Sequence, residues 1–291
     1  MSVSITRRTC LASLGLLMTG CAQWEVPKVD EVSSLPTPVL PVDSVVLEIA
    51  FARLPLADVA TYGSIWEEVD EQHFPADLRR ELSANGVRVG IIGMQLPPKL
   101  KEILDAGSGS IIENGEDSSS GDADVDRADR RIQCRNGRRA KIVVAKEYAT
   151  LSLLLLEDSR VRGLLLSDAS CLFGLRVFPQ GDGRARLDLT PEVEYGELKT
   201  KYTGRDGAVV PQVGHDRVVL DRMKLEAMLA PGQVLMISTT PEAKGLGQSY
   251  FVETEGGTIF RRILLIRLAV TQHDDLFAPD QLVTPLATPG E

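Results

Sequence analysis

Asp182-Gly-Arg-Ala-Arg-Leu-Asp-Leu-Thr-Pro-Glu-Val193 is the stretch of this chain that decides its fold class. Apolar and polar side chains alternate along it, with the apolar set at Ala185, Leu187, Leu189 and Val193. A period of two is that of an antiparallel strand with one buried and one solvated face. Asp182-Gly183 at its start has the composition of a hairpin turn. The stretch therefore predicts a strand of an antiparallel sheet.

Similar segments flank this strand. Met223 to Leu229 alternates in the same way, and Pro231-Gly232 and Glu255-Gly256-Gly257 supply further turns. The expected strands cover 141–145, 174–178, 184–193, 223–229, 234–237, 250–253 and 263–270, with apolar runs of undecided type at 151–156 and 164–166. Short strands separated by tight turns predict a mainly antiparallel β domain over residues 132–277, followed by a loose Pro-rich tail over 278–291.

The first half of the chain carries mixed signals. Val45–Arg53 and Val87–Met94 are rich in apolar and β-branched residues, which favours strands. Ser64–Leu82 has helical spacing, with Ser64 as the N-cap, an interruption at Pro75 and a stop at Asn85-Gly86; a second helix runs from Pro97-Pro98 to Leu104. We therefore expect a small β-α-β-α unit over residues 44–106, and the fold class is α+β.

An acidic segment rich in Ser and Gly, residues 107–131, joins the two parts. Dense charge with few apolar residues predicts a flexible linker. A calcium loop is the alternative, but the spacing of Asp122, Asp124 and Asp126 lacks the glycine and the terminal glutamate of the helix-loop-helix site.

The N-terminus resembles a bacterial lipoprotein signal. Two arginines, Arg7 and Arg8, precede the apolar run Cys10–Met18, and Thr19-Gly20-Cys21 follows. A basic start, a short apolar core and small residues define an export signal that is too short to span a bilayer. A small pair before cysteine resembles the lipobox, with Met18 where that family more often has Leu.

This resemblance implies cleavage after residue 20 and acyl chains, such as palmitate, on Cys21. Residues 21–43 would then form a Pro-rich tether. Ala22, in place of an aspartate, favours the outer membrane. The alternative is an ordinary cleaved signal with an incidental cysteine. Thr6–Leu11 also resembles a twin-arginine export signal, so both export routes stay open.

Charge and composition exclude several partners. The chain has 291 residues, 43% of them hydrophobic, and a formal net charge of -9. A strongly acidic balance argues against nucleic acid and against adhesion to a membrane through basic residues. A lipid anchor is consistent with this charge.

Two cysteines of the mature chain, Cys134 and Cys171, have two interpretations. An oxidising compartment allows a disulfide between them. Alternatively, they are two buried thiols that pack as small apolar residues. A zinc site is not expected, because the two lie far apart in sequence without paired histidines.

The sequence contains no recognisable catalytic motif. The three histidines are His73, which we expect on the surface, His215, expected in a loop, and His273. His273-Asp274-Asp275 is the best candidate for an acid/base pair or metal site, but neighbouring residues of an extended chain point apart. Gly245–Ser249 is Gly-rich and expected to be a flexible loop before a strand. We therefore predict no catalytic residue, no metal and no cofactor.

The order of the strands in the second half resembles the secretin homology domain of type II and type III secretion systems. The motifs are Ile132–Val144 with its Asn136-Gly137 turn, Gly174–Pro179 followed by Asp182–Val193, Ala230–Leu235, and the closing strand Arg262–Thr271. Val45–Ala52 resembles the strand that precedes that domain. Ser238-Thr239-Thr240 replaces the usual Gly-Gly, and the closing strand lacks Thr-Pro. The chain thus resembles a short, degenerate relative.

These observations predict a non-catalytic, lipid-anchored protein of the cell envelope, on the periplasmic face of the outer membrane. The resemblance implies a secretin-like module that binds or assembles with envelope proteins, further copies of itself included. One alternative is a lipid-anchored periplasmic enzyme with an unrecognised site built on His273, Asp274 and Asp275. Another is a passive spacer without a specific ligand.

Overall fold

The computed structural model describes residues 41, 43–107, 124–125, 130–158, 160–205 and 208–271. Side chains are described in these ranges except at 124–125, 130, 146–147, 201–205 and 208–212. All of them belong to one compact unit, Leu40–Glu291. The expected signal, most of the tether and linker, and the C-terminal tail lie outside the described residues.

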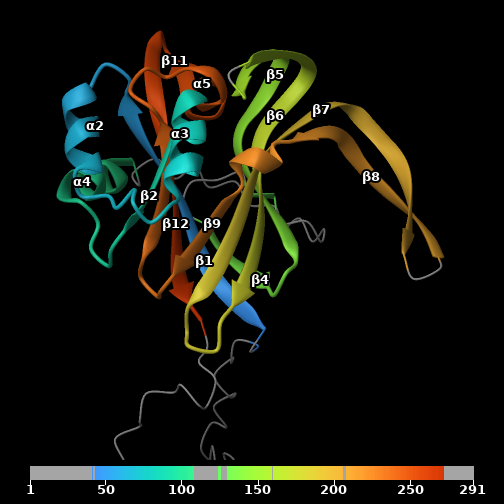
Figure 1. Ribbon diagram of the computed structural model, residues 1–291, viewed down its shortest axis with the longest axis horizontal. Coiled ribbons are helices and arrows are strands. Elements are labelled where there is room, and N and C mark those ends of the chain that lie inside the picture. Colours follow the sequence, from blue (N-terminus) through green and yellow to red (C-terminus); the bar gives the residue numbers. More distant parts are fainter. Residues whose placement is uncertain are drawn as a thin grey trace, which may run out of the picture. The chain divides into compact units, whose positions relative to one another are not determined.

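Strands predominate, and most helices lie in the first half of the chain (Figure 1). In chain order the elements are β1 (Ser44–Pro55), α2 (Val59–Trp66), α3 (Ala76–Ala84), β2 (Val87–Ile92), α4 (Pro98–Gly107), β3 (Asp124–Val125), β4 (Arg130–Arg135), β5 (Arg139–Glu157), β6 (Arg160–Pro179), β7 (Ala185–Arg205), β8 (Ala208–Val219), the 3-10 turn η1 (Asp221–Met223), β9 (Leu225–Leu229), β10 (Val234–Thr239), α5 (Gly245–Phe251), β11 (Val252–Glu255) and β12 (Thr258–Val270). The expected α+β class with a largely antiparallel β domain is confirmed.

The first sheet has the order β2-β10-β12-β1-β4, with β11 paired to β12, and its strands are antiparallel. β10 and β12 lie between β1 and β2. The expected β-α-β-α segment therefore shares its sheet with the C-terminal strands and does not form a sheet of its own. Strands from both ends of the described chain, β1 and β12, are direct neighbours at the centre.

The second sheet has the order β3-β5-β6-β7-β8, with β9 paired to β7. All pairs except the short parallel β3–β5 contact are antiparallel. The strand predicted at 184–193 is the first part of β7, and its four alternating apolar residues are fully buried. Its turn is also confirmed, because Gly183 has a φ of +82° and links β6 to β7.

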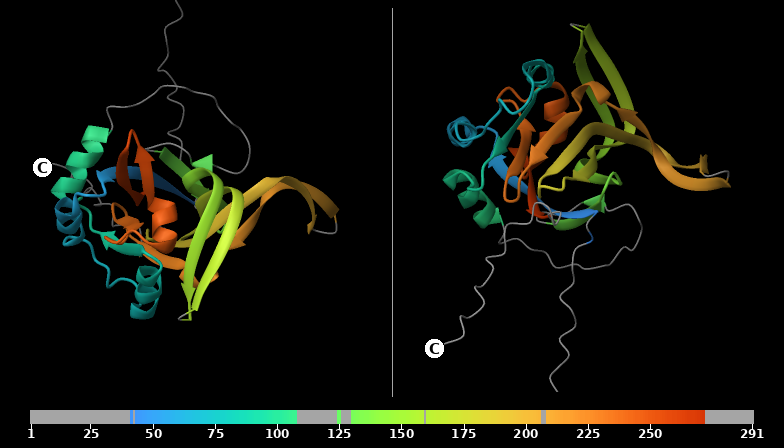
Figure 2. Two further views of the ribbon diagram at one scale, coloured as in Figure 1. Left: turned by 90° about the horizontal axis from the view of Figure 1, so that it is seen from above. Right: turned by 60° about the horizontal axis from the view of Figure 1, so that its bottom comes forward.

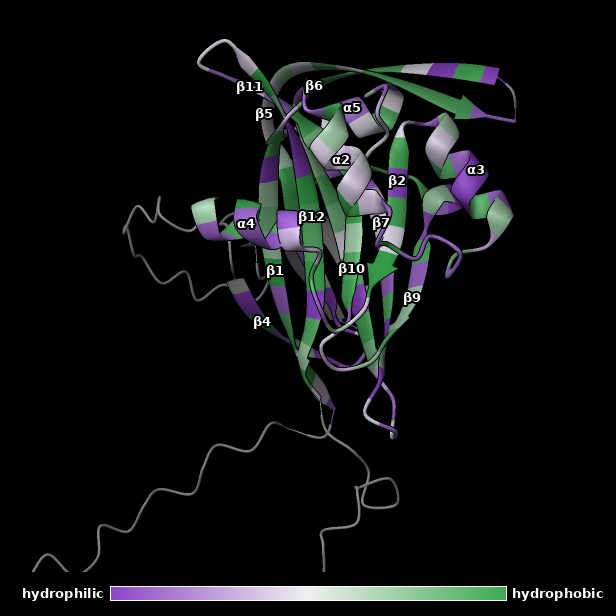
Figure 3. Ribbon diagram, turned by 90° about the vertical axis from the view of Figure 1, so that its left-hand side faces the viewer, coloured by the Kyte–Doolittle hydropathy of each residue, from purple (hydrophilic) through white to green (hydrophobic). Residues whose placement is uncertain are grey.

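Two cores hold the layers together. The central core lies between the sheets and includes Val45, Leu47 and Ile49 of β1. The outer core lies on the opposite face of the first sheet, where Tyr62, Ile65 and Trp66 of α2 and Leu100 of α4 cover it. The first sheet is thus buried on both faces, which accounts for its long hydrophobic runs (Figure 3). Figure 2 shows the helices on one side of this sheet and the second sheet on the other.

The single interrupted helix expected at Ser64–Leu82 is wrong in detail. α2 begins earlier, with Asp58 as the N-cap whose carboxylate accepts a hydrogen bond from the Thr61 amide at 3.1 Å. Ser64 lies inside α2, and its hydroxyl donates to the Thr61 carbonyl. A separate helix, α3, restarts after Pro75 and ends at Asn85, as Pro75 and Asn85-Gly86 indicated.

The loop expected at Gly245–Ser249 is also wrong, because these residues begin helix α5. Leu246, Tyr250 and Phe251 are spaced as on one helix face and are fully buried in the central core. Burial of three large side chains outweighs the weak helix propensity of two glycines. The expected strand at 250–253 accordingly starts at Val252.

Candidate interaction surface

The second sheet divides into two hairpin arms. β6 and β7 are paired only over Ser170–Pro179 of β6 and Ala185–Glu194 of β7. Beyond this fork, β5–β6 and β7–β8 continue as separate two-stranded arms (Figures 1 and 2). Irregularities mark the division: the registers of β5–β6 and β7–β8 shift there, and Asp168 and Gly196 have positive φ angles. Past the fork, the edge of β6 that faced β7 pairs with no described strand.

The β5–β6 arm is apolar on both faces. Its inner face carries Leu151, Leu153 and Leu155, which are buried in the central core. On the outer face, β5 residues 152, 154 and 156 lie opposite Leu165, Gly163 and Val161 of β6. Leu154, Val161 and Leu165 are 56%, 69% and 74% exposed. We call these three residues, with the half-buried Leu156, the outer apolar face.

Such a surface is unusual for a protein that stays alone in water. Contiguous exposed apolar side chains mark sites of association, and an unpaired strand edge beside them offers backbone hydrogen bonds to a partner. Here both features occur on the same arm. The arm is therefore the best candidate for an interaction surface among the described residues.

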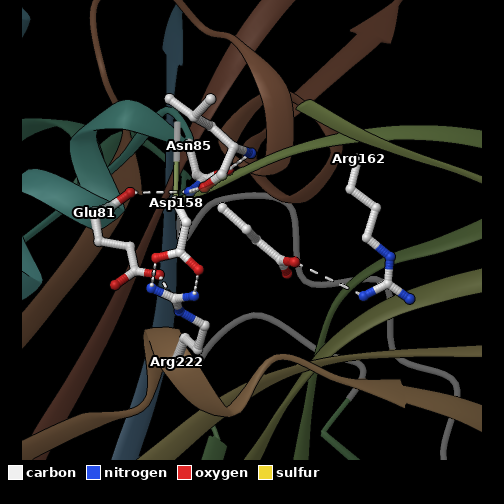
Figure 4. A network of polar contacts seen from close by, with 7 residues as sticks. Glu81, Asn85, Asp158, Arg162 and Arg222 are labelled. Atoms are coloured by element: carbon white, nitrogen blue, oxygen red, sulfur yellow. Dashed lines mark hydrogen bonds and ion pairs between the residues drawn. The ribbon is translucent and has the colours of Figure 1, made fainter. Parts of the chain in front are cut away.

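A polar clamp fixes the tip of this arm to the body (Figure 4). The Asn85 side-chain amide donates to the Leu156 carbonyl at 3.0 Å, and its oxygen accepts from the Leu156 amide at 2.7 Å. Asp158 accepts two hydrogen bonds from Arg222, at 2.5 and 2.7 Å, and Arg222 also donates to Glu81 at 3.0 Å. The Arg222 hydrogen bonds lower the pKa of Asp158. The clamp holds the inner face of the arm against the core, so the outer apolar face stays exposed to solvent.

The β7–β8 arm carries its own exposed apolar residues near the fork, Leu198 and Val213, each 64% exposed. Lys199 forms an ion pair with Asp216 at 2.6 Å, and His215 Nδ1 lies 2.6 Å from the Gly196 carbonyl oxygen. His215 lies within strand β8, so its expected position in a loop is wrong. This contact places the imidazole ring against the irregular stretch of β7 between Tyr195 and Lys199.

Where β6 and β7 are paired, the outer face of the second sheet is charged rather than apolar. Glu192, almost fully buried, accepts from Arg139 at 2.6 Å and lies 3.5 Å from Arg217. Asp188 pairs with Lys224 at 2.9 Å. Gly174 leaves room for the Glu192 side chain, because a Cβ at residue 174 would lie 2.3 Å from the Glu192 carboxylate. Glu192 and Asp188 each have a cationic partner, so the network joins neighbouring strands of the second sheet.

Arg261 is a buried cation that the sequence did not single out. It is fully buried on β12, stacks on Tyr62 of α2 with its guanidinium carbon 3.7 Å from the ring centre, and donates to the Pro241 carbonyl at 3.2 Å. Burial lowers its pKa, and Tyr62 opposes that effect. The stacking joins α2 to the first sheet. Its Nε and Nη1 atoms have no hydrogen-bond partner among the described residues.

The predicted site residues fall into three groups. Cys21 and the His273-Asp274-Asp275 group lie outside the described residues. Cys134 and Cys171 are buried and unbridged, and burial raises the pKa of each thiol to about 12. His73 is exposed, as expected. Within the described ranges, no group of three or more His, Cys, Asp or Glu side chains is arranged to hold a metal ion.

The outer apolar face was missed because its residues do not alternate. Leu153 to Leu156 are four consecutive leucines, so the sequence showed an apolar run without an exposed side. The charged residues that follow this run, Glu157, Asp158, Arg160 and Arg162, indicated a solvent-exposed tip.

Comparisons with known proteins give no match: no family model, no curated protein and no solved structure resembles this chain significantly. Among the helices of the described residues, none is both long and apolar enough to cross a bilayer.

Proposed function

We propose that this chain is a non-catalytic, lipid-anchored protein of the cell envelope whose β domain assembles with envelope proteins, copies of itself included. The proposal places it on the periplasmic face of the outer membrane, held by acyl chains on Cys21. The secretin-like order of the strand motifs agrees with a role in assembly. No activity, metal or cofactor forms part of the proposal.

One observation carries the assembly part: the β5–β6 arm exposes apolar side chains on its outer face and an unpaired edge on β6. Leu165 and Val161 are among the most exposed large apolar residues of the described chain. A partner that covers them removes apolar area from water, and each such residue contributes about 1.5–3 kcal/mol when fully buried. Pairing along β6 adds backbone hydrogen bonds.

Native gels and electron microscopy of the detergent-extracted protein test the assembly. We expect a discrete complex from the unaltered chain and its loss in Leu165→Asp, because a carboxylate at the centre of the contact is desolvated without a partner. Val59→Asp is the matched control, because Val59 is likewise an exposed apolar residue (54%) but lies at the start of α2. A monomer at every concentration in the unaltered chain, or equal loss in both variants, contradicts the proposal.

Metabolic labelling tests the anchor. We expect labelled palmitate in the unaltered protein and none in Cys21→Ser, because the thiol is the atom that is acylated. Absence of label from the unaltered protein rules out the lipid anchor, whatever the outcome for assembly.

A further inference from the structure

A groove lies on the helix side of the first sheet, beside α4. Its volume is about 450 Å³, within the range of roughly 300–1,000 Å³ that small-molecule sites occupy. The floor is formed by Ala50, Val234 and Leu265, one residue from each of β1, β10 and β12. Leu96, which precedes α4, and Leu104 of α4 form the wall. These five residues make the groove an aliphatic channel without an aromatic side chain.

The groove exists because the helical layer covers only part of this face. Ala52, Leu54 and Ile263 lie under α2 and α4 and are almost completely buried. Ala50 lies two residues before Ala52, on the same face of β1, and is only partly buried. Its small side chain leaves space above the sheet. Helix α4 packs against β1, and Figure 3 shows the two side by side.

A charged row closes one margin of the groove. Arg131 of β4, Glu48 of β1 and Arg267 of β12 are register neighbours across three strands. Arg131 Nε and Arg267 Nε each donate to Glu48, both at 2.6 Å. One carboxylate faces two guanidinium groups, so the row carries a net positive charge. Each guanidinium has five N–H donors, more than Glu48 can accept, and the Arg131 side chain is 72% exposed.

We propose that this groove binds a single-chain amphiphile, with its hydrocarbon chain on the aliphatic floor and its anionic head on Arg131 and Arg267. Aliphatic walls suit a flexible hydrocarbon chain, whereas sugars and nucleobases are usually held by aromatic stacking. The two arginines supply charge-assisted hydrogen bonds to a carboxylate or a phosphate. The site lies on the helix side of the first sheet and is independent of the proposed assembly surface.

Fluorescence of cis-parinaric acid, a natural reporter fatty acid, tests binding to the full chain. The Cys21→Ser protein is used so that its own acyl chains do not compete. We expect one saturable site, from which dodecanoate and dodecyl phosphate, below their micelle concentrations, displace the probe. Dodecanol should displace it about ten-fold less well, because it lacks the charge that pairs with the arginines. Stronger displacement by dodecanoate identifies a free fatty acid as the ligand, and stronger displacement by dodecyl phosphate identifies a single-chain phospholipid.

Two variants locate the site. Ala50→Leu fills the floor and should lower affinity for the probe at least ten-fold. Arg131→Gln should lower affinity for dodecanoate about ten-fold and leave dodecanol unchanged. Arg135→Gln is the control, because it removes the same charge from an exposed position of the same strand that does not line the groove.

The outcomes are decisive even if Ala50→Leu fails to fold, since Arg131 is largely exposed and its replacement leaves the core intact. Absence of saturable probe binding, equal affinity for dodecanol and dodecanoate, or equal effects of Arg131→Gln and Arg135→Gln overturns the proposal. Leu165→Asp should bind the probe normally, which separates this result from a failure of assembly.

Discussion

Two glycines set the distance between α5 and the end of α3. Gly247 lies so close to Gly86 that a Cβ on it would stand 1.8 Å from the Gly86 carbonyl oxygen. Gly86 itself has a φ of +79°, the left-handed conformation that ends α3. The sequence identified Gly86 as a helix stop, whereas the need for Gly247 follows from a contact between residues 161 positions apart, which no local pattern contains.

Gly247→Ala should therefore destabilise the protein, although alanine is the better helix former. We expect a loss of about 2–4 kcal/mol in the free energy of unfolding, from a clash with rigid backbone. Gly63→Ala in α2 is the matched control, because no atom lies within 4 Å of its Cβ, and it should gain about 0.5–1 kcal/mol. Urea unfolding of the full chain measures both; equal effects would contradict the close approach.

The two buried thiols lead to a second prediction at this scale. Because burial raises the pKa of Cys134 and Cys171 to about 12, neither forms a thiolate at pH 8 in the folded state. We expect a maleimide to leave both unmodified in the native protein and to modify both in urea without reductant, as mass spectrometry can show. Lack of modification in urea would instead establish a disulfide.

At the level of elements, regular alternation predicted the strands that have one buried face. Beyond the fork it failed, because the bulges change which residues face the core. In β5 the core residues are even-numbered before the bulges, as at Ile142 and Val144, and odd-numbered after them, as at Leu151 and Leu153. The core residues of β6 change in the same region, from odd-numbered at Ala169 and Cys171 to even-numbered at Leu166. The undecided runs at 151–156 and 164–166 are thus the part of the sheet where the candidate surface lies.

The clamp at the tip of the β5–β6 arm can be tested through Asn85. Asn85→Ala removes both side-chain hydrogen bonds to Leu156, so the backbone amide and carbonyl of Leu156 lose these partners. We expect a loss of about 1–3 kcal/mol and faster hydrogen exchange of the Leu156 amide. Ser83→Ala, on an exposed position of α3, should change neither quantity. Unchanged exchange at Leu156 in Asn85→Ala would mean that the clamp does not hold the arm.

At the scale of the whole molecule, the sequence predicted the class of fold but not the way in which its halves combine. The sequence predicted a β-α-β-α unit and a β domain as separate parts. Their union in one sheet depends on β1 pairing with β12, over register contacts such as Glu48 with Arg267. Pairings between strands more than 200 residues apart leave no local signal. For the same reason the amphiphile groove, built from β1, β10 and β12, was not foreseen.

Glu48 links three strands of that sheet, and its titration should affect global stability. Burial acts to raise its pKa, but the hydrogen bonds of Arg267 and Arg131 outweigh burial, and the pKa is lowered from 4.5. A lowered folded-state pKa stabilises the protein above pH 4.5, and this contribution is lost as the pH falls through the folded-state value.

Glu48→Gln should thus cost about 1 kcal/mol at pH 7, since both arginines are partly exposed, and progressively less below pH 4.5. Thermal unfolding over pH 3–7 measures the difference. Glu102→Gln, which removes an exposed ion pair with Lys99, should have no measurable effect at any pH. A difference between Glu48→Gln and the unaltered protein that stays constant with pH would refute this assignment.

The central place of β12 has a consequence for the timing of folding. Without β12, the first sheet consists of two disconnected pairs, β1–β4 and β2–β10, and the helical layer has no complete surface to cover. A chain that leaves a ribosome or a translocation channel from its N-terminus therefore cannot close this sheet until residue 258 and those after it have emerged. The first sheet of the nascent chain therefore stays open until β12 has been synthesised.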